Sequence, residues 1–226
     1  MTARNLLYFC CFLLIYQNTC AGTGDILISP GYTKVHFPFR GIEKHKDQGS
    51  YQLNLHFSLI LNKSVSITTG LAYEDRGYRV GFPQDDPQGL ETKSKNFMLE
   101  YLVFPIYADY HVFGNATHHL SARVGIEVGR LVAKSMETTL YNGQTTDQFI
   151  GDYHVKKFIT SALLGCNYRY DFWKHYFVNA SPAVRMILSD QSGMHGRTTE
   201  GSSLSFAFRI GVGVKLPANL SSSPRR

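Results

Sequence analysis

The sequence predicts an all-β protein, an eight-stranded antiparallel up-and-down transmembrane β-barrel, and three observations support this prediction. Apolar and polar residues alternate over most of the chain, and a period of two indicates β-strands. The connections between successive alternating segments are long and short in turn. The apolar positions of the clearest segments carry no charge over six or seven alternate residues, which is enough to cross a bilayer with a tilted strand of about ten residues.

The clearest alternation lies in the middle of the chain, in two long segments at residues 97–113 and 118–134. A short turn, Gly114-Asn115-Ala116-Thr117, joins them, so the pair is predicted to form a β-hairpin. The second segment has an apolar face and a face of small and charged residues. The apolar face consists of Leu120, Ala122, Val124, Ile126 and Val128. The face of small and charged residues consists of Ser121, Arg123, Gly125, Glu127 and Gly129.

Other segments of the chain repeat this alternation. In chain order, the predicted strands are residues 25–39, 50–61, 64–74, 97–113, 118–134, 153–172, 176–188 and 203–216. The first strand is expected to be broken at Pro30 and Gly31, because proline cannot donate a hydrogen bond to a neighbouring strand. The last is the most regular, with Phe208 and Ile210 on either side of Arg209.

The lengths of the connections predict how the strands are arranged. Short turns are expected at residues 62–63, 114–117 and 173–175, and long loops at residues 40–49, 75–95, 135–152 and 189–201. All short turns then lie at one end of the sheet, and an even number of strands returns both chain ends to that end. This layout is typical of an outer-membrane barrel with periplasmic turns and outer loops.

A secreted soluble barrel of the lipocalin type has the same period, but its apolar face points inward. Two observations favour apolar residues on the outside. The polar face is rich in Gly, Ser and Ala, which fit the narrow interior of a small barrel better than a solvated surface. The apolar face of the clearest strands has no charged residue. We therefore expect Phe208→Arg to be far more damaging than Gly211→Ser.

The N-terminus has the features of a secretory signal peptide. Arg4 precedes an apolar run at residues 6–16, which is too short to span a bilayer as a helix, and small residues precede the expected cleavage site. The predicted organisation is a signal peptide at residues 1–21, an outer-membrane barrel at residues 22–216 and a short polar tail at residues 217–226.

Cysteine usage predicts no disulfide framework. Of the four cysteines, Cys10, Cys11 and Cys20 lie in the predicted leader, and only Cys166 remains afterwards. We expect the Cys166 thiol to act as a small hydrophobic group. Lipid attachment at Cys20 is an alternative to simple cleavage of the leader, although Gln17 fits the lipoprotein pattern poorly.

The overall charge argues against nucleic-acid binding. The formal net charge is +6, but the basic residues are scattered or lie in loops, without the clustering of a nucleic-acid surface.

Aromatic residues make up 13% of the chain, with 14 Tyr and 15 Phe, and this content suits a protein with two membrane interfaces. The expected partners are outer-membrane lipid and the barrel-assembly machinery, and the expected state is a monomer.

Charged residues on the predicted inner face form the first set of candidate site residues. They are Asp109, Arg123, Glu127, Arg169, Arg185 and Arg209. Unpaired charges in a narrow lumen are costly, so we expect a paired polar network that fills the barrel. A narrow polar path for a solute is the alternative interpretation.

No catalytic, cofactor-binding or metal site is predicted. The histidines near predicted strand ends are His111, His118, His119, His154 and His175, and the residues that offer partners are Ser161, Ser181, Asn179 and Asp152. No Ser-His spacing typical of a nucleophile is present. His118 and His119 are adjacent, so their side chains point to opposite faces of a strand.

Three segments resemble the PorT-like outer-membrane β-barrel proteins of Gram-negative bacteria. Tyr101-Leu102-Val103-Phe104-Pro105-Ile106 is similar to that family's Tyr-Leu-Glu-Ile-Pro-Leu strand, and residues 123–129 are similar to its Gly-rich following strand. Residues 71–77 are similar to a strand that enters an outer loop. The sequence departs from the family at Val103, where an acid is usual, and at Asp109, where a lysine is common. The resemblance implies a membrane barrel and, in some members, an accessory role in protein secretion.

The predicted function is that of a non-enzymatic integral outer-membrane protein with a structural or surface-interaction role. Long outer loops would carry this role and meet a protein partner. The aromatic recognition candidates in these loops are Tyr78, Phe82, Tyr141 and Phe149. Packing of these rings over the barrel mouth is a simpler explanation. The alternative functions are an accessory component of a secretion system and, less favoured, a lipid-modifying enzyme.

Overall fold

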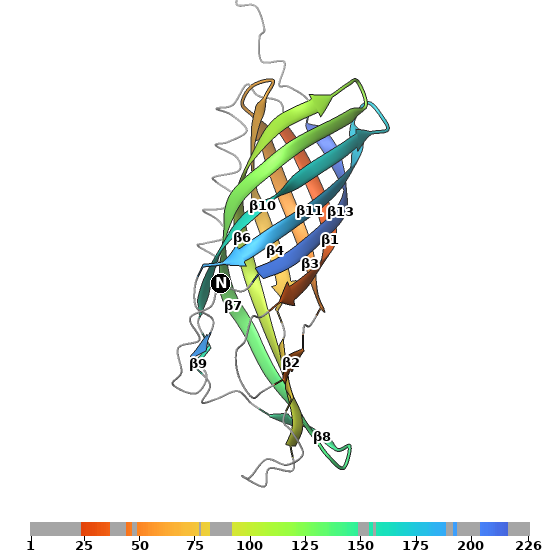
Figure 1. Cartoon of the computed structure of the whole chain (residues 1–226). Coiled ribbons are helices and arrows are strands. Elements are labelled where there is room, and N and C mark those ends of the chain that lie inside the picture. Colours follow the sequence, from red (N-terminus) through yellow and green to blue (C-terminus); the bar gives the residue numbers. More distant parts are fainter. Residues whose placement is uncertain are drawn as a thin grey trace, which may run out of the picture.

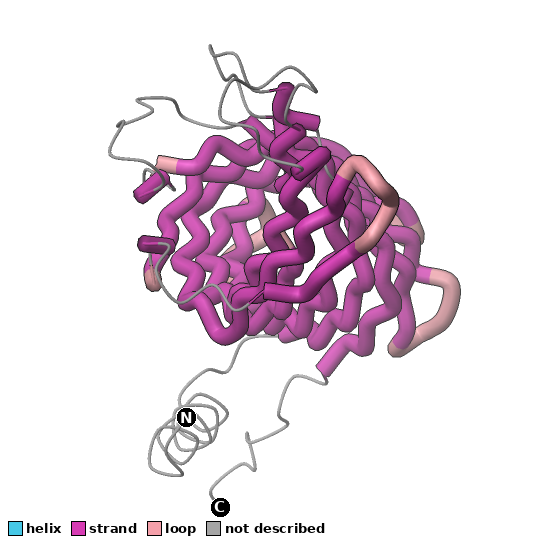
Figure 2. The backbone as a smooth tube through the Cα atoms, turned by 90° about the horizontal axis from the view of Figure 1, so that it is seen from below, coloured by secondary structure: helices cyan, strands magenta, loops and turns pink. Residues whose placement is uncertain are grey.

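Long antiparallel strands form a closed ring, which Figure 2 shows end-on. The computed structural model describes residues 24–36, 44–46, 49–76, 78–81, 92–148, 154–155, 157–188, 192–193 and 204–216. Within these residues the ring consists of β1 (Gly24–His36), β3 (Gly49–Ile60), β4 (Val65–Asp75), β6 (Thr92–Gly114), β7 (His118–Leu140), β10 (Phe158–Asp171), β11 (Tyr176–Ile187) and β13 (Leu204–Leu216).

The order of these strands around the ring is β6-β4-β3-β1-β13-β11-β10-β7, and pairing of β6 with β7 completes it. Each ring strand therefore has two antiparallel neighbours, and the first and last strands meet. The predicted eight-stranded up-and-down barrel is confirmed. No helix among the described residues is both long and apolar enough to cross a membrane.

The apolar residues of the barrel face outward. In β13, Phe206 and Phe208 are 60% and 48% exposed, whereas Ser205, Ala207 and Arg209 between and beside them are at most 4% exposed. The other ring strands alternate in the same sense. This arrangement excludes a lipocalin-type barrel, whose apolar residues would fill the interior.

Exposed aromatic residues gather near both ends of the apolar wall. Near the short turns they are Tyr110, Phe113, Tyr168, Tyr170, Phe172, Trp173 and Tyr176, and toward the other end they are Tyr32, Tyr51, Tyr73, Phe158 and Phe206. Aromatic girdles of this kind mark the two membrane–water interfaces of a transmembrane barrel. They place the short turns at one membrane surface.

The short turns are stabilised locally by asparagine side chains. The Asn62 Oδ1 atom accepts hydrogen bonds from the backbone N–H groups of Ser64 and Val65 at 2.8 and 2.9 Å. Asn115 Oδ1 accepts in the same way from Thr117 and His118. Such asparagine turns let a chain reverse within a few residues, so the sequence specifies the short connections directly.

The first strand differs from its prediction. β1 is continuous through Pro30 and Gly31, and its register with β3 is unbroken. Pairing with β13 skips only Ser29 and Pro30, as expected because Pro30 has no N–H group to donate. Proline therefore removes hydrogen bonding on one side without breaking the strand. The predicted end of this strand, residues 37–39, lies outside the described residues.

The long connections also differ from their prediction. Residues 75–95 and 135–152 were expected to be loops, but β6 begins at Thr92 and β7 continues to Leu140, so the two strands pair far beyond the ring (Figure 1). Three short strands widen this hairpin, namely β2 (Lys44–Lys46), β5 (Tyr78–Gly81) and β8 (Thr145–Gln148). Polar residues dominate the additional strand segments, so they lack the apolar alternation that identifies membrane strands.

The predicted strand at residues 153–172 is two elements. β10 begins only at Phe158, and the short strand β9 (His154–Val155) pairs instead with β12 (Ser192–Gly193). The predicted leader at residues 1–21 and the tail at residues 217–226 lie outside the described residues, so both remain predictions.

The inner face is packed more tightly than its small residues suggested. A Cβ atom on Gly211 would lie 2.5 Å from both the Ile28 carbonyl oxygen and the Ser29 Cβ atom. This packing argues against a mild effect of Gly211→Ser, because the added atom meets backbone of the neighbouring strand. The expected order, with Phe208→Arg the more damaging, stays a prediction.

Phe208→Arg tests the outward face. We expect it to destabilise the folded protein in bilayers by about 2 to 4 kcal/mol, because it places a charge in hydrocarbon. Phe208→Leu is the matched control and should be nearly neutral. Refolding into lipid vesicles at increasing denaturant measures both values. Equal stability of the Arg and Leu variants would contradict a lipid-facing position.

Candidate functional site

The centre of the lumen is organised around the carboxylate of Glu127 on β7. Arg185 Nε lies 2.6 Å from Oε2, and Arg209 Nη2 donates to Oε1 at 2.9 Å. The hydroxyl group of Tyr107 donates to the same Oε1 at 2.5 Å and accepts from Arg209 Nη1 at 3.0 Å. Glu127 therefore joins β6, β11 and β13 across the interior of the barrel.

A second carboxylate, Glu74 on β4, extends this cluster toward the outer end. Its oxygen atoms accept hydrogen bonds from Arg185 Nη1 at 2.5 Å and from Arg76 Nη2 at 2.8 Å. Arg76 also lies 3.6 Å from Glu127. These side chains are between 1 and 4% exposed. Three arginines and two glutamates thus form one buried network in which the charges lie in direct contact.

Asp109 and Arg123 form a separate pair on the facing strands β6 and β7. Arg123 donates to both carboxylate oxygens, with Nε at 2.6 Å and Nη2 at 2.9 Å. Thr68 donates to Asp109 Oδ2 at 2.9 Å. The Arg123 guanidinium also lies over the Tyr107 ring, 4.8 Å from its centroid, so the aromatic ring connects this pair to the Glu127 cluster.

Arg169 belongs to a third group near the short turns. It bonds Asp25 on β1 and, through Nε at 2.6 Å, Asp171 Oδ1 on its own strand. Asp171 also accepts from Lys215 Nζ at 2.7 Å and bonds His119 at 3.1 Å. The six inner charges identified in the sequence therefore lie in three groups along the lumen.

Several members of these groups were missed in the sequence. They are Asp25, Glu74, Arg76, Tyr107, Asp171 and Lys215. Glu74, Tyr107 and Lys215 occupy inner positions of the alternation, so strict use of the period of two would have identified them. Arg76 follows the end of β4 and has no such pattern to identify it.

An open cavity of about 340 Å³ lies at the short-turn end of the lumen. The charged residues of its lining are Asp25, Lys63, Asp109, Arg123 and Arg169, and His111 and His119 lie among them. The charge network fills the barrel between this cavity and the outer end. The lumen is thus accessible from the short-turn end and occupied by side chains beyond it.

The aromatic candidates of the outer connections are only partly described. Tyr78 lies on β5 and pairs in register with Phe97. Tyr141 is half-buried in the turn that joins β7 to β8, where Gly143 has a φ of +85° that favours glycine. Phe82 and Phe149 lie outside the described residues. The structure thus places two of the four candidates, and it places them on different connections.

Among the residues that the structure describes, neither serine considered for catalysis bonds a histidine. The Ser161 hydroxyl has no hydrogen-bond partner within the described part of the chain, and Ser181 donates to Asn167 and Asn179. Both serines are buried inside the barrel rather than at the membrane edge. His118 bonds the Tyr168 hydroxyl at 2.7 Å, with both residues on the outer surface.

Comparison with known families agrees with this architecture. A family model described as outer membrane protein beta-barrel domain matches residues 28–183. The chain belongs to this family. It is therefore an outer-membrane β-barrel protein. No curated protein sequence matches the chain.

Three of the solved structures to which the chain is similar are outer-membrane protein OprG, Ail and Neisserial surface protein A. OprG from Pseudomonas aeruginosa is 14% identical, with a TM-score of 0.49, and the match covers 86% of this chain and 97% of OprG. Ail, the attachment invasion locus protein of Yersinia pestis, is 14% identical, with a TM-score of 0.47 and coverage of 86% and 99%. Neisserial surface protein A is 11% identical, with a TM-score of 0.46 and the same coverage.

Glu127→Gln tests the central cluster. The change keeps the shape of the side chain but removes the negative charge that Arg185 and Arg209 contact, so we expect a loss of about 3 to 5 kcal/mol in the free energy of unfolding. Glu137→Gln, on the part of β7 beyond the ring, is the control and should change stability by less than about 1 kcal/mol. Denaturant titration of refolded protein measures both. A stability equal to that of the unsubstituted protein would argue that Glu127 is not buried among arginines.

The filled lumen predicts low conductance. Purified protein in planar bilayers should show no large steady ion current, because a barrel of this size has room for little more than its own side chains. Current recording at several voltages tests this. A stable, wide, conducting pore would contradict the arrangement of Glu74, Glu127 and the three arginines across the barrel.

Proposed function

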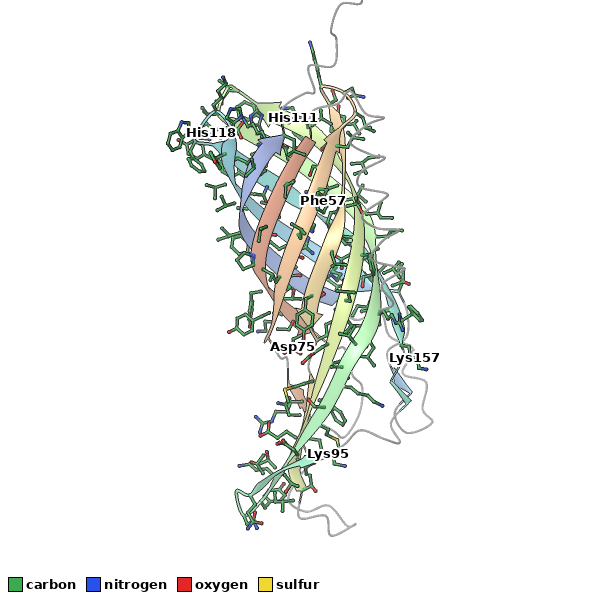
Figure 3. All side chains as sticks on the ribbon, turned by 180° about the vertical axis from the view of Figure 1, so that it is seen from behind. Phe57, Asp75, Lys95, His111, His118 and Lys157 are labelled. Atoms are coloured by element: carbon green, nitrogen blue, oxygen red, sulfur yellow. The ribbon has the colours of Figure 1, made fainter. Side chains whose placement is uncertain are left out.

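We propose that this outer-membrane protein is a non-enzymatic surface-interaction protein that binds a partner through the sheet beyond its outer rim. The observation that carries this proposal is the continuation of β6 and β7 past the ring, where β5 and β2 extend the sheet on one side and β8 on the other. Figure 3 shows the length of this part, with Asp75 near the rim and Lys95 far along the hairpin. We name it the outer sheet.

The outer sheet has buried side chains of its own. Phe97 on β6 and Met136 on β7 are paired in register and are 2% and 3% exposed. Thr138 and Ser94 are also buried, and Arg79 Nη2 donates to Ser94 Oγ at 2.9 Å. Packed side chains hold a surface in one shape, and a fixed surface binds a partner with less loss of conformational entropy than a mobile loop.

The remainder of the barrel supports the same proposal. Lipid-facing residues are constrained to be apolar, and the lumen is occupied by paired charges along most of its length. Both constraints leave little freedom for recognition. Residues outside the membrane are free of them, and rigid scaffolds commonly carry recognition at such sites.

Two further points remain proposals. The chain is inserted as a monomer by the barrel-assembly machinery, and it belongs to the PorT-like branch that residues 101–106 and 123–129 resemble. An accessory role in protein secretion is the alternative that this branch suggests. It differs from surface binding in a measurable way, because loss of a secretion component changes the set of exported proteins.

Removal of the outer sheet tests the proposal. In the trimmed variant, one short Gly-containing turn replaces residues 77–98 and another replaces residues 132–156. These cuts preserve the Arg76 N–H bond to the Leu99 carbonyl at 2.7 Å and the Leu131 N–H bond to the Lys157 carbonyl at 2.8 Å. We expect the trimmed barrel to fold and to show gel mobility that changes on heating, but to fail to restore the phenotype of a deletion strain.

Point substitutions provide the matched control. Phe97→Ser should loosen the outer sheet and increase cleavage there by protease added to intact cells, whereas Phe113→Ser at the opposite membrane surface should not. A trimmed protein that fully restores the deletion strain would refute a role for the outer sheet. A deletion strain with altered exported proteins would favour the secretion alternative.

A further inference from the structure

Two histidines meet at the short-turn end of the lumen. His111 lies near the end of β6 and His119 near the start of β7, and both line the open cavity. Figure 3 shows this end of the barrel, with His111 and His118 labelled. The outer sheet is at the opposite end, so this region is independent of the proposed surface function.

A local irregularity in the β6–β7 pairing brings the two imidazoles together. The register shifts between His111 and Phe113, so that Gly114 rather than Phe113 is paired with His119. Bulges of this kind turn side chains in a new direction. The ring centroids of His111 and His119 are 5.7 Å apart, with an angle of 46° between the rings.

The nitrogen atoms of the two rings approach one small space beside Gly114. His111 Nε2 and His119 Nδ1 lie 2.6 and 3.0 Å from the position that a Cβ atom on Gly114 would occupy. Any side chain at residue 114 would therefore displace them. Glycine at this position leaves free the space that both nitrogens border.

The second nitrogen of His119 is held by a carboxylate. His119 Nε2 lies 3.1 Å from Asp171 Oδ2. A carboxylate accepts hydrogen bonds, so in the neutral imidazole the N–H group is on Nε2 and the lone pair is on Nδ1. Arg169 at 2.6 Å and Lys215 at 2.7 Å fix Asp171 in turn. A histidine that ligates a metal commonly donates its other N–H to a carboxylate in this way.

We propose that His111 Nε2 and His119 Nδ1 bind a divalent transition-metal ion at the periplasmic mouth of the barrel. Imidazole nitrogen is a preferred ligand of Zn²⁺, Cu²⁺ and Ni²⁺. Among the residues described, no three metal-ligating side chains gather in one cluster. The protein therefore supplies two ligands, and water or a solute in the cavity completes the coordination. Such a site binds an exchangeable ion and opens to the periplasm.

Most charged side chains around the two histidines are paired with one another. Asp109 is paired with Arg123, and Arg169 lies between Asp25 and Asp171. Each of these arginines is therefore paired with a carboxylate, and Lys63 is the further cationic side chain that lines the cavity. The only protein charge that faces His119 within hydrogen-bonding distance, among the residues described, is the carboxylate of Asp171.

Metal titration of the full-length mature protein, produced without a polyhistidine tag and folded in detergent, tests the proposal. Calorimetry with Zn²⁺ and absorption spectroscopy with Co²⁺ should each report one ion per chain. His111→Ala and His119→Ala should each weaken Zn²⁺ binding at least about tenfold. Asp171→Asn should weaken it by a smaller factor, because it removes orientation but no ligand.

His118→Ala is the matched control, because His118 is adjacent in sequence but bonds Tyr168 on the outer surface. It should leave Zn²⁺ affinity unchanged. Heat-dependent gel mobility checks that each variant is folded, and Gly114→Ala, which crowds both nitrogens, provides a second route to loss of binding. Absence of stoichiometric binding, or equal loss in His118→Ala and His119→Ala, would overturn the proposal.

Discussion

The structure depends on one constraint, which is that every backbone N–H and C=O group within the membrane needs a hydrogen-bond partner. A flat sheet leaves two open edges, and closure removes them. β1 and β13, the first and last ring strands along the chain, pair at eleven positions from Gly24 to His36, with a gap only at Ser29 and Pro30, so neither strand is left as an open edge. The rest of the architecture follows, since closure also fixes which residues face lipid and which face the interior.

Closure of a small barrel creates a second requirement, because inward side chains have little space and no bulk water. The sequence meets it by combining small residues with charges that compensate one another. Arg185 contacts both Glu74 and Glu127, so one guanidinium joins two carboxylates from different strands. A buried charge with a removed partner is strongly unfavourable, so these residues are best understood as a unit that fills and orders the lumen.

The two ends of the barrel differ in structure. At the short-turn end, asparagine side chains stabilise the connections, and the lumen opens into a cavity lined by histidines and paired charges. At the outer end, β6 and β7 pair well beyond the ring and build a sheet with buried Phe97 and Met136. The membrane wall between them is chemically uniform. The polar surface that water can reach is therefore concentrated at the two ends.

The sequence alone determined the period of two, the outward apolar face, the strand count and the short turns, because these depend on neighbouring residues and on the solvent that each face meets. It also identified Glu127, Arg185 and Arg209 as inner charges. Only the tertiary structure decided which charges meet. Glu74 and Arg185 are 111 positions apart, and their contact depends on the stagger of the strands when the ring closes. The outer sheet and the His111–His119 pair were equally hidden, since polar strand pairing and a local bulge leave no periodic signal in the chain.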